Sequence, residues 1–119
     1  MKRVANIMIG LLASLHVYIL LLEMFFWESP TSLKTFGLTP ELAKETVVLG
    51  ANQGLYNGFL AAGLMWGLYL GREGRSVKTF FLLCIFVAGV FGAVSVNPRI
   101  LMIQAVPAAI ALVLLHWKR

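Results

Sequence analysis

The sequence predicts an all-α integral membrane protein, an antiparallel bundle of four transmembrane helices. Of the 119 residues, 60% are hydrophobic and 13% are charged, whereas about a quarter of the residues are charged in typical soluble domains. The apolar residues fall in four runs of about twenty, separated by short polar segments. Basic residues cluster beside these runs rather than along one soluble face, so nucleic acid is not an expected partner.

The first predicted span covers residues 4–27. It is too long for the core of a signal peptide, so we expect it to remain in the mature protein. His16 and Glu23 interrupt this span, and their spacing places them on nearly the same side of a helix. Met24, Phe25, Phe26 and Trp27 end it as an interfacial belt of apolar and aromatic side chains.

An extracytoplasmic loop is predicted over residues 28–45, followed by the second span over residues 46–70. Thr39, Pro40 and Glu41 have the pattern of a helix start, with a capping side chain, a proline in the first turn and an early acid. We expect the second span to grow out of this start. Leu33, Phe36 and Leu38 are expected on the membrane surface or against the end of the bundle.

The second span combines small and polar residues. Gly50, Gly54 and Gly58 recur every four residues and form one stripe, which allows another helix to approach closely. The same span carries the carboxamides of Asn52, Gln53 and Asn57, which are costly in hydrocarbon unless they find partners.

The third and fourth spans are predicted over residues 77–96 and 100–117, joined by a tight turn at Asn97–Pro98. A small-residue face on the third span contains Ala88, Gly89, Gly92 and Ala93. In the fourth span Pro107 removes a backbone donor, so the carbonyl of Ile103 lacks its usual helical partner.

The orientation follows from the basic residues of the loops and termini. Seven lie on the side predicted to be cytoplasmic and three on the other, which predicts a protein of the cytoplasmic membrane with both termini inside. The seven are Lys2, Arg3, Arg72, Arg75, Lys78, Lys118 and Arg119, and the three are Lys34, Lys44 and Arg99.

Polar side chains from three spans are predicted at similar depth in the outer half of the membrane, roughly 6–16 Å below the boundary at the helical rise of 1.5 Å per residue. We expect them to line a pocket that binds a small, partly lipophilic molecule, because ionisable groups within a membrane usually mark a working site. If the pocket carries chemistry, the acid–base pair is Glu23 and His16. The ligand-binding candidates are Asn52, Gln53, Asn57, Tyr56 and Gln104.

Each of these residues also has a structural interpretation, in which Glu23 is solvated at the interface and the imidazole and amides join neighbouring helices. Two further functions therefore stay open, a proton-coupled transporter and an assembly partner of another membrane protein. The sequence also allows the protein to form a homo-oligomer through its glycine-rich helix faces. No familiar catalytic motif is present, and we expect neither a metal nor another cofactor.

Several stretches resemble a family of small bacterial membrane proteins catalogued as domain of unknown function 1304. The most specific is the run from Ala51 to Gly63, A-N-Q-G-L-Y-N-G-F-L-A-A-G. Glu23-Met24-Phe25, Phe36-Gly37-Leu38-Thr39-Pro40 and the fourth span with Gln104 and Pro107 fit the same pattern. The resemblance covers nearly the whole chain and implies a four-helix membrane protein, but it brings no activity, ligand or catalytic residue.

Overall fold

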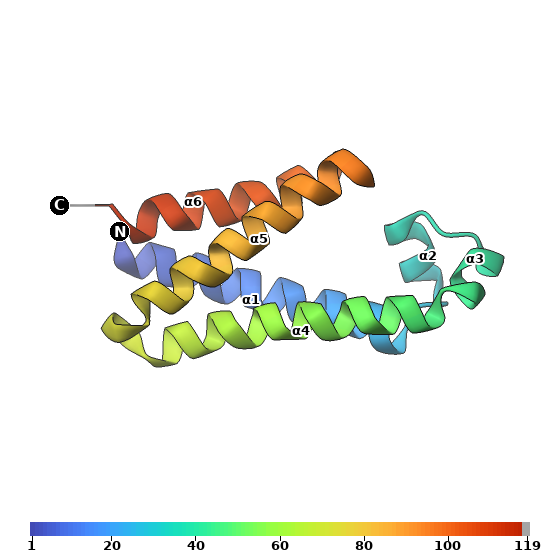
Figure 1. Cartoon of the computed structure of the whole chain (residues 1–119), viewed down its shortest axis with the longest axis horizontal. Helices are drawn as coiled ribbons and strands as arrows, with labels where there is room; N and C mark the ends of the chain where they lie inside the picture. Colours follow the sequence, from blue (N-terminus) through green and yellow to red (C-terminus); the bar gives the residue numbers. More distant parts are fainter. Residues whose placement is uncertain (118–119) are drawn as a thin grey trace. The chain divides into compact units, whose positions relative to one another are not determined.

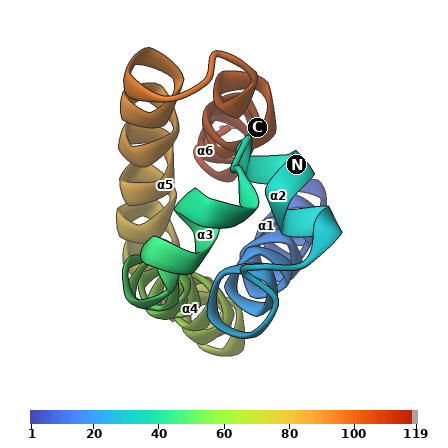
Figure 2. The same cartoon turned by 90° about the vertical axis from the view of Figure 1, so that its right-hand side faces the viewer.

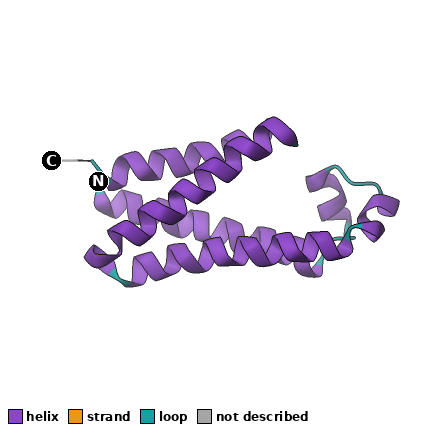
Figure 3. Cartoon of the chain, viewed as in Figure 1, coloured by secondary structure: helices purple, strands orange, loops and turns teal. Residues whose placement is uncertain are grey.

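A computed structural model describes residues 1–117, and within that range all the regular structure is helical (Figure 3). The predicted all-α class is confirmed for this part of the chain. The helices in chain order are α1 (Lys2–Phe25), α2 (Pro30–Phe36), α3 (Pro40–Glu45), α4 (Val47–Tyr69), the 3₁₀ turn η1 (Gly71–Gly74), α5 (Arg75–Ser95), the π-helical turn η2 (Leu101–Ala105) and α6 (Val106–Leu115) (Figure 1).

The described residues divide into two compact units, which we call the terminal unit and the central unit. The central unit is Ser14–Phe59, and the terminal unit is Met1–Ala13 together with the described residues from Leu60 onward. Both α1 and α4 contribute residues to each unit.

In the central unit, the expected loop contains two short capped helices, α2 and α3, between the end of α1 and the start of α4 (Figure 2). Ser29 caps α2, with its hydroxyl accepting from the backbone N–H of Ser32, and Gly37 ends that helix at a φ of 65°, the left-handed region that glycine tolerates. The predicted helix start at Thr39 is confirmed, because its hydroxyl accepts from the N–H of Leu42 and Pro40 occupies the first turn.

The expectation that the second span grows out of this start is wrong, because α3 ends at Glu45 and α4 begins at Val47. Thr46 between them has a φ of −112° and a ψ of 18°. Its hydroxyl donates to the carbonyl of Leu42 at 2.7 Å and accepts from the indole Nε1 of Trp27 at 3.0 Å. These two bonds stabilise the break, and the second comes from a distant part of the chain.

The sequence predicts that Trp27 belongs to an interfacial belt, and the structure shows that it also contacts several other parts of the central unit. Its ring is 5.1 Å from that of Phe36 between centroids, and a Cβ added at Gly50 would lie 2.6 Å from the indole. The side chain joins the end of α1 to α2, to Thr46 and to the start of α4.

The terminal unit pairs α5 with α6, which lie side by side (Figure 2). The small-residue face contributes to this packing, since a Cβ at Gly89 would lie 2.6 Å from the backbone nitrogen of Ala105. In the connecting turn, the side-chain oxygen of Asn97 accepts from the N–H of Arg99 at 2.9 Å. The turn η2 bonds the N–H of Val106 to the carbonyl of Leu101, a wider turn of the kind that accommodates the missing donor of Pro107.

Two described stretches, Lys2–Phe25 and Gly71–Ser95, are long and apolar enough to cross a membrane. They make the chain a candidate membrane protein. The apolar stretch Leu101–Leu115 is shorter. The helix α4 has 23 residues, and it is not among the described stretches that are both long and apolar enough.

Candidate functional site

The most distinctive polar contact of the central unit joins Glu23 of α1 to Asn57 of α4. The Nδ2 amide of Asn57 donates to Oε1 of Glu23 at 2.7 Å, and the same amide donates to the carbonyl of Gln53 at 3.1 Å. The Glu23 side chain is only 8% exposed although it belongs to an apolar helix. The sequence separation of 34 residues makes this a tertiary contact between two helices.

The glycine stripe of α4 lets α1 and α4 come close enough for this hydrogen bond to form. A Cβ at Gly54 would lie 2.5 Å from Cγ of Met24 and 3.1 Å from both Cβ of Glu23 and the carbonyl oxygen of Leu20. At Gly58 it would lie 2.7 Å from Cδ1 of Leu20. The prediction that this stripe packs against another helix is confirmed, and the other helix is α1.

The direction of these contacts shows that the two helix segments are antiparallel. Gly50 meets Trp27, Gly54 meets Met24, and Gly58 meets Leu20, so the α4 number rises as the α1 number falls. Asn57 lies next to Gly58 in this register, and it reaches Glu23 because small neighbours bring the two backbones close.

His16, the second candidate for acid–base chemistry, is fully buried and makes an interaction within the protein. It lies two turns before Glu23 on α1, as the sequence spacing predicts. A joint catalytic role for the two side chains stays a prediction.

The other predicted residues of α4 have different surroundings. Asn52 is exposed, and its amide donates to the carbonyl of Val48 on its own helix at 3.1 Å. Gln53 and Tyr56 are also exposed, and the Tyr56 ring lies 6.2 Å from that of Phe59 between centroids. Asn57 is thus the member of this group with a bond to Glu23.

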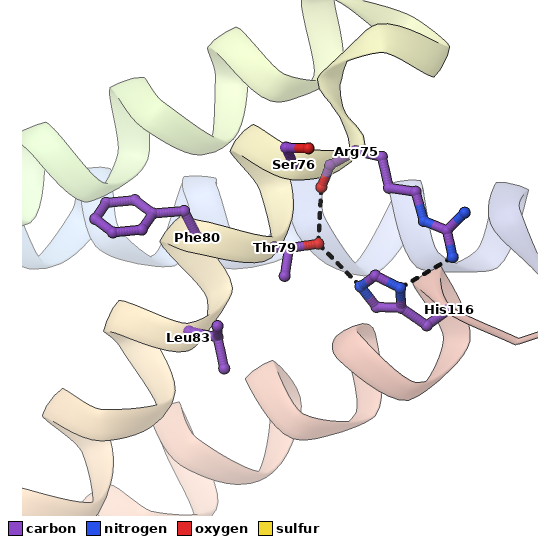
Figure 4. A pocket seen from close by; sticks show the side chains of 6 residues that line it. All are labelled: Arg75, Ser76, Thr79, Phe80, Leu83 and His116. Atoms are coloured by element: carbon purple, nitrogen blue, oxygen red, sulfur yellow. Dashed lines mark hydrogen bonds between the residues drawn. The ribbon is translucent and has the colours of Figure 1, made fainter.

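Gln104 belongs to the terminal unit, where it lies in η2 and makes an interaction of its own. An open surface pocket of about 430 Å³ in the same unit is lined by residues outside the predicted set. These are Arg75, Ser76, Thr79, Phe80, Leu83 and His116 (Figure 4).

A buried carboxyl held by an amide can bind the polar group of a ligand or exchange a proton with it. Sequence reasoning selected both partners, Glu23 and Asn57, from their cost in an apolar helix. It did not identify Trp27 and Thr46, which join the end of α1 to the start of α4. The available signal was Gly50, because a glycine in a packing stripe leaves room for a neighbouring group to approach the backbone.

Residues 10–116 match the sequence family described as "Protein of unknown function (DUF1304)". The uncharacterized protein YpaA of Lactococcus lactis subsp. lactis (strain IL1403) is 28% identical over 113 residues, which are 92% of this chain and 95% of the relative. No solved structure matches the chain. The family match covers most of the chain, including both residues of the Glu23–Asn57 contact, and the chain therefore belongs to the DUF1304 family.

Proposed function

We propose that this protein is a four-span protein of the cytoplasmic membrane that binds a small, partly lipophilic molecule through Glu23 and Asn57. In this proposal α1, α4, α5, and η2 with α6 cross the bilayer, and both termini are cytoplasmic. His16 completes the polar lining from α1. Whether the bound molecule is also transformed depends on proton exchange by Glu23 and His16.

The membrane part of the proposal is supported by the outer surface of α5. Phe80, Val87, Phe91 and Val94 are 60%, 63%, 71% and 84% exposed, and their spacing follows one side of the helix. Only 22% of the apolar window in Gly71–Ser95 is buried, whereas the core helix of a soluble protein is mostly buried. An exposed apolar surface of this kind is favoured when lipid, rather than water, surrounds the helix.

The orientation rests on the charge bias of the loops and termini, seven basic residues against three. Lys118 and Arg119, which contribute to the larger group, lie outside the described residues. With them or without them, the larger group lies beside the N-terminus and the α4–α5 turn.

The binding part rests on the burial of Glu23 in an apolar helix and its 2.7 Å bond to Asn57. An ionisable side chain at membrane depth is costly and usually functional. A carboxyl that already accepts one amide bond can bind a donor group of a ligand with its remaining lone pairs. The apolar side chains around it would contact the lipophilic part.

Glu23→Gln tests this proposal sharply. Glutamine keeps an oxygen that accepts from Asn57, so the helix contact survives, while the carboxyl is removed. We expect the full chain, purified in mild detergent, to carry a bound small molecule that native mass spectrometry detects. Glu23→Gln is expected to lose that molecule while its melting temperature stays close to that of the wild type.

Asn57→Leu and Asn52→Leu form a matched pair of amide substitutions on one helix. Asn57→Leu removes the donor to Glu23, so this variant is expected to lose the ligand. Asn52 is exposed and its amide donates to a carbonyl of its own helix, so Asn52→Leu is expected to retain the ligand. Equal occupancy in the wild type, Glu23→Gln and Asn57→Leu would refute the binding site, as would a wild-type protein with nothing bound.

The second candidate is a structural role for the Glu23–Asn57 pair. Among residues 1–117, every buried side-chain nitrogen or oxygen atom has a hydrogen-bond partner, which a purely structural contact also requires. This role predicts that Asn57→Leu destabilises the protein by about 1–3 kcal/mol and changes nothing else, because Glu23 loses its donor.

A further inference from the structure

A polar cluster of three side chains joins the start of α5 to the end of α6 in the terminal unit (Figure 4). Nη2 of Arg75 is 2.9 Å from Nδ1 of His116, and Oγ1 of Thr79 is 2.9 Å from Nε2 of the same ring. The hydroxyl of Thr79 also donates to the carbonyl of Arg75 at 2.7 Å.

The donor and acceptor chemistry of the neighbouring side chains gives a direction to each of these hydrogen bonds. Arginine only donates, so Nδ1 of His116 accepts its bond. The single hydroxyl proton of Thr79 is used by the Arg75 carbonyl, so its oxygen accepts from Nε2 of His116. The contact with His116 occupies one of the five N–H donors of Arg75.

The cluster forms the polar end of the 430 Å³ pocket. Ser76 contributes a further hydroxyl, while Phe80 and Leu83 provide apolar walls further along α5 (Figure 4). These two apolar side chains are 60% and 48% exposed. The lining thus divides into a cationic, hydroxyl-bearing end and an apolar end, which matches a ligand with an anionic head and a hydrocarbon tail.

The sequence around the pocket has a net positive charge, which attracts an anionic head group. Arg72 and Arg75 are exposed and lie three residues apart, with one acid, Glu73, between them. Lys78 is buried and its ammonium donates to the side-chain oxygen of Asn6 at 3.0 Å, so it is not part of this surface charge. Arginine binds phosphate oxygens in a bidentate manner, and hydroxyl groups add neutral donors. Basic residues directly beside an apolar span favour anionic lipids of the cytoplasmic leaflet.

We propose that this pocket binds the phosphate group of an anionic phospholipid. Arg75 and Ser76 contact the phosphate, Thr79 and His116 hold Arg75 in place, and an acyl chain follows Phe80 and Leu83. The pocket shares no residue with the Glu23–Asn57 contact, and this inference rests only on the membrane location from the function proposed above.

Native mass spectrometry of the full chain in detergent tests this with three probes: phosphatidylglycerol, phosphatidylcholine and inorganic phosphate. Both lipids carry the phosphate, so they differ at this site in the cationic choline of phosphatidylcholine, which nearby arginines repel. We expect phosphatidylglycerol to bind about fivefold more tightly than phosphatidylcholine for this reason. Arg75→Gln is expected to weaken phosphatidylglycerol binding by about tenfold, because the phosphate loses a charge-assisted bond. Arg72→Gln, the same charge change three residues earlier, is expected to weaken binding less than Arg75→Gln, by about fivefold or less, because Arg72 contributes only its charge.

Ser76→Asp provides a variant whose folding is not in question. A carboxylate in the first turn of α5 favours the helix, yet it repels phosphate in the pocket, so lipid binding is expected to fall about tenfold without a lower melting temperature. Unchanged binding in Arg75→Gln and Ser76→Asp would overturn the proposal, as would equal losses in Arg72→Gln and Arg75→Gln. Displacement of the lipid by millimolar inorganic phosphate would instead assign the site to free phosphate. These outcomes do not depend on Glu23, so they are distinguishable from failure of the proposed ligand site.

Discussion

Replacement of Gly54 by alanine tests the packing that holds the Glu23–Asn57 contact. The added Cβ would lie 2.5 Å from Cγ of Met24, 3.1 Å from Cβ of Glu23 and 3.1 Å from the carbonyl oxygen of Leu20. Met24 is flexible and can rotate away. The Leu20 carbonyl belongs to the backbone of α1, so relief there requires the two helices to separate.

Gly10→Ala is the matched control, because a Cβ at Gly10 meets nothing within 4 Å. Both substitutions gain about 1 kcal/mol from the higher helix propensity of alanine. At Gly54, overpacking costs about 1–3 kcal/mol, so Gly54→Ala should be less stable than Gly10→Ala by about this amount. For a chain of this size, that difference corresponds to about 4–12 °C in melting temperature.

The assay is thermal unfolding in detergent, followed by tryptophan fluorescence. Gly58→Ala is expected between the other two variants, since its Cβ would meet only the end of the flexible Leu20 side chain, at 2.7 Å. The expected order of melting temperatures is Gly10→Ala, then Gly58→Ala, then Gly54→Ala. Equal melting temperatures, or the reverse order, would show that α1 and α4 do not pack through this stripe.

Two further predictions concern topology and the Trp27 contacts. A reporter fused within residues 28–45 is expected to be extracytoplasmic and one fused after the C-terminus cytoplasmic, and a cytoplasmic signal from the loop would reject the orientation. Trp27→Phe removes the bond to Thr46 and is expected to lower the free energy of unfolding by about 1 kcal/mol, measured by denaturant titration in detergent. Phe26→Leu is its control, because that ring is 55% exposed and its change should stay within about 0.5 kcal/mol.

The residues that sequence reasoning placed correctly follow local rules. Thr39 and Pro40 begin α3 because a capping hydroxyl and a proline act within one turn. The Gly50–Gly54–Gly58 stripe was predicted from helical periodicity, which requires no knowledge of the partner. Glu23 and Asn57 were selected because polar groups in an apolar helix need partners, whichever those partners are.

Only the tertiary structure decided which partners these residues have. Local rules favoured one helix from Thr39 into the second span, but the chain breaks at Thr46, whose hydroxyl accepts a bond from Trp27, 19 residues earlier. The pairing of Glu23 with Asn57 rather than with an exposed amide such as Asn52 depends on the close approach of two backbones. Similarly, His116 meets Arg75 and Thr79 across 41 and 37 residues. The sequence by itself determined the long helices, the cap at Thr39 and the small-residue faces, because these depend on neighbours within one or two turns. The polar partnerships depend on the register between helices, which is determined by packing across the whole fold.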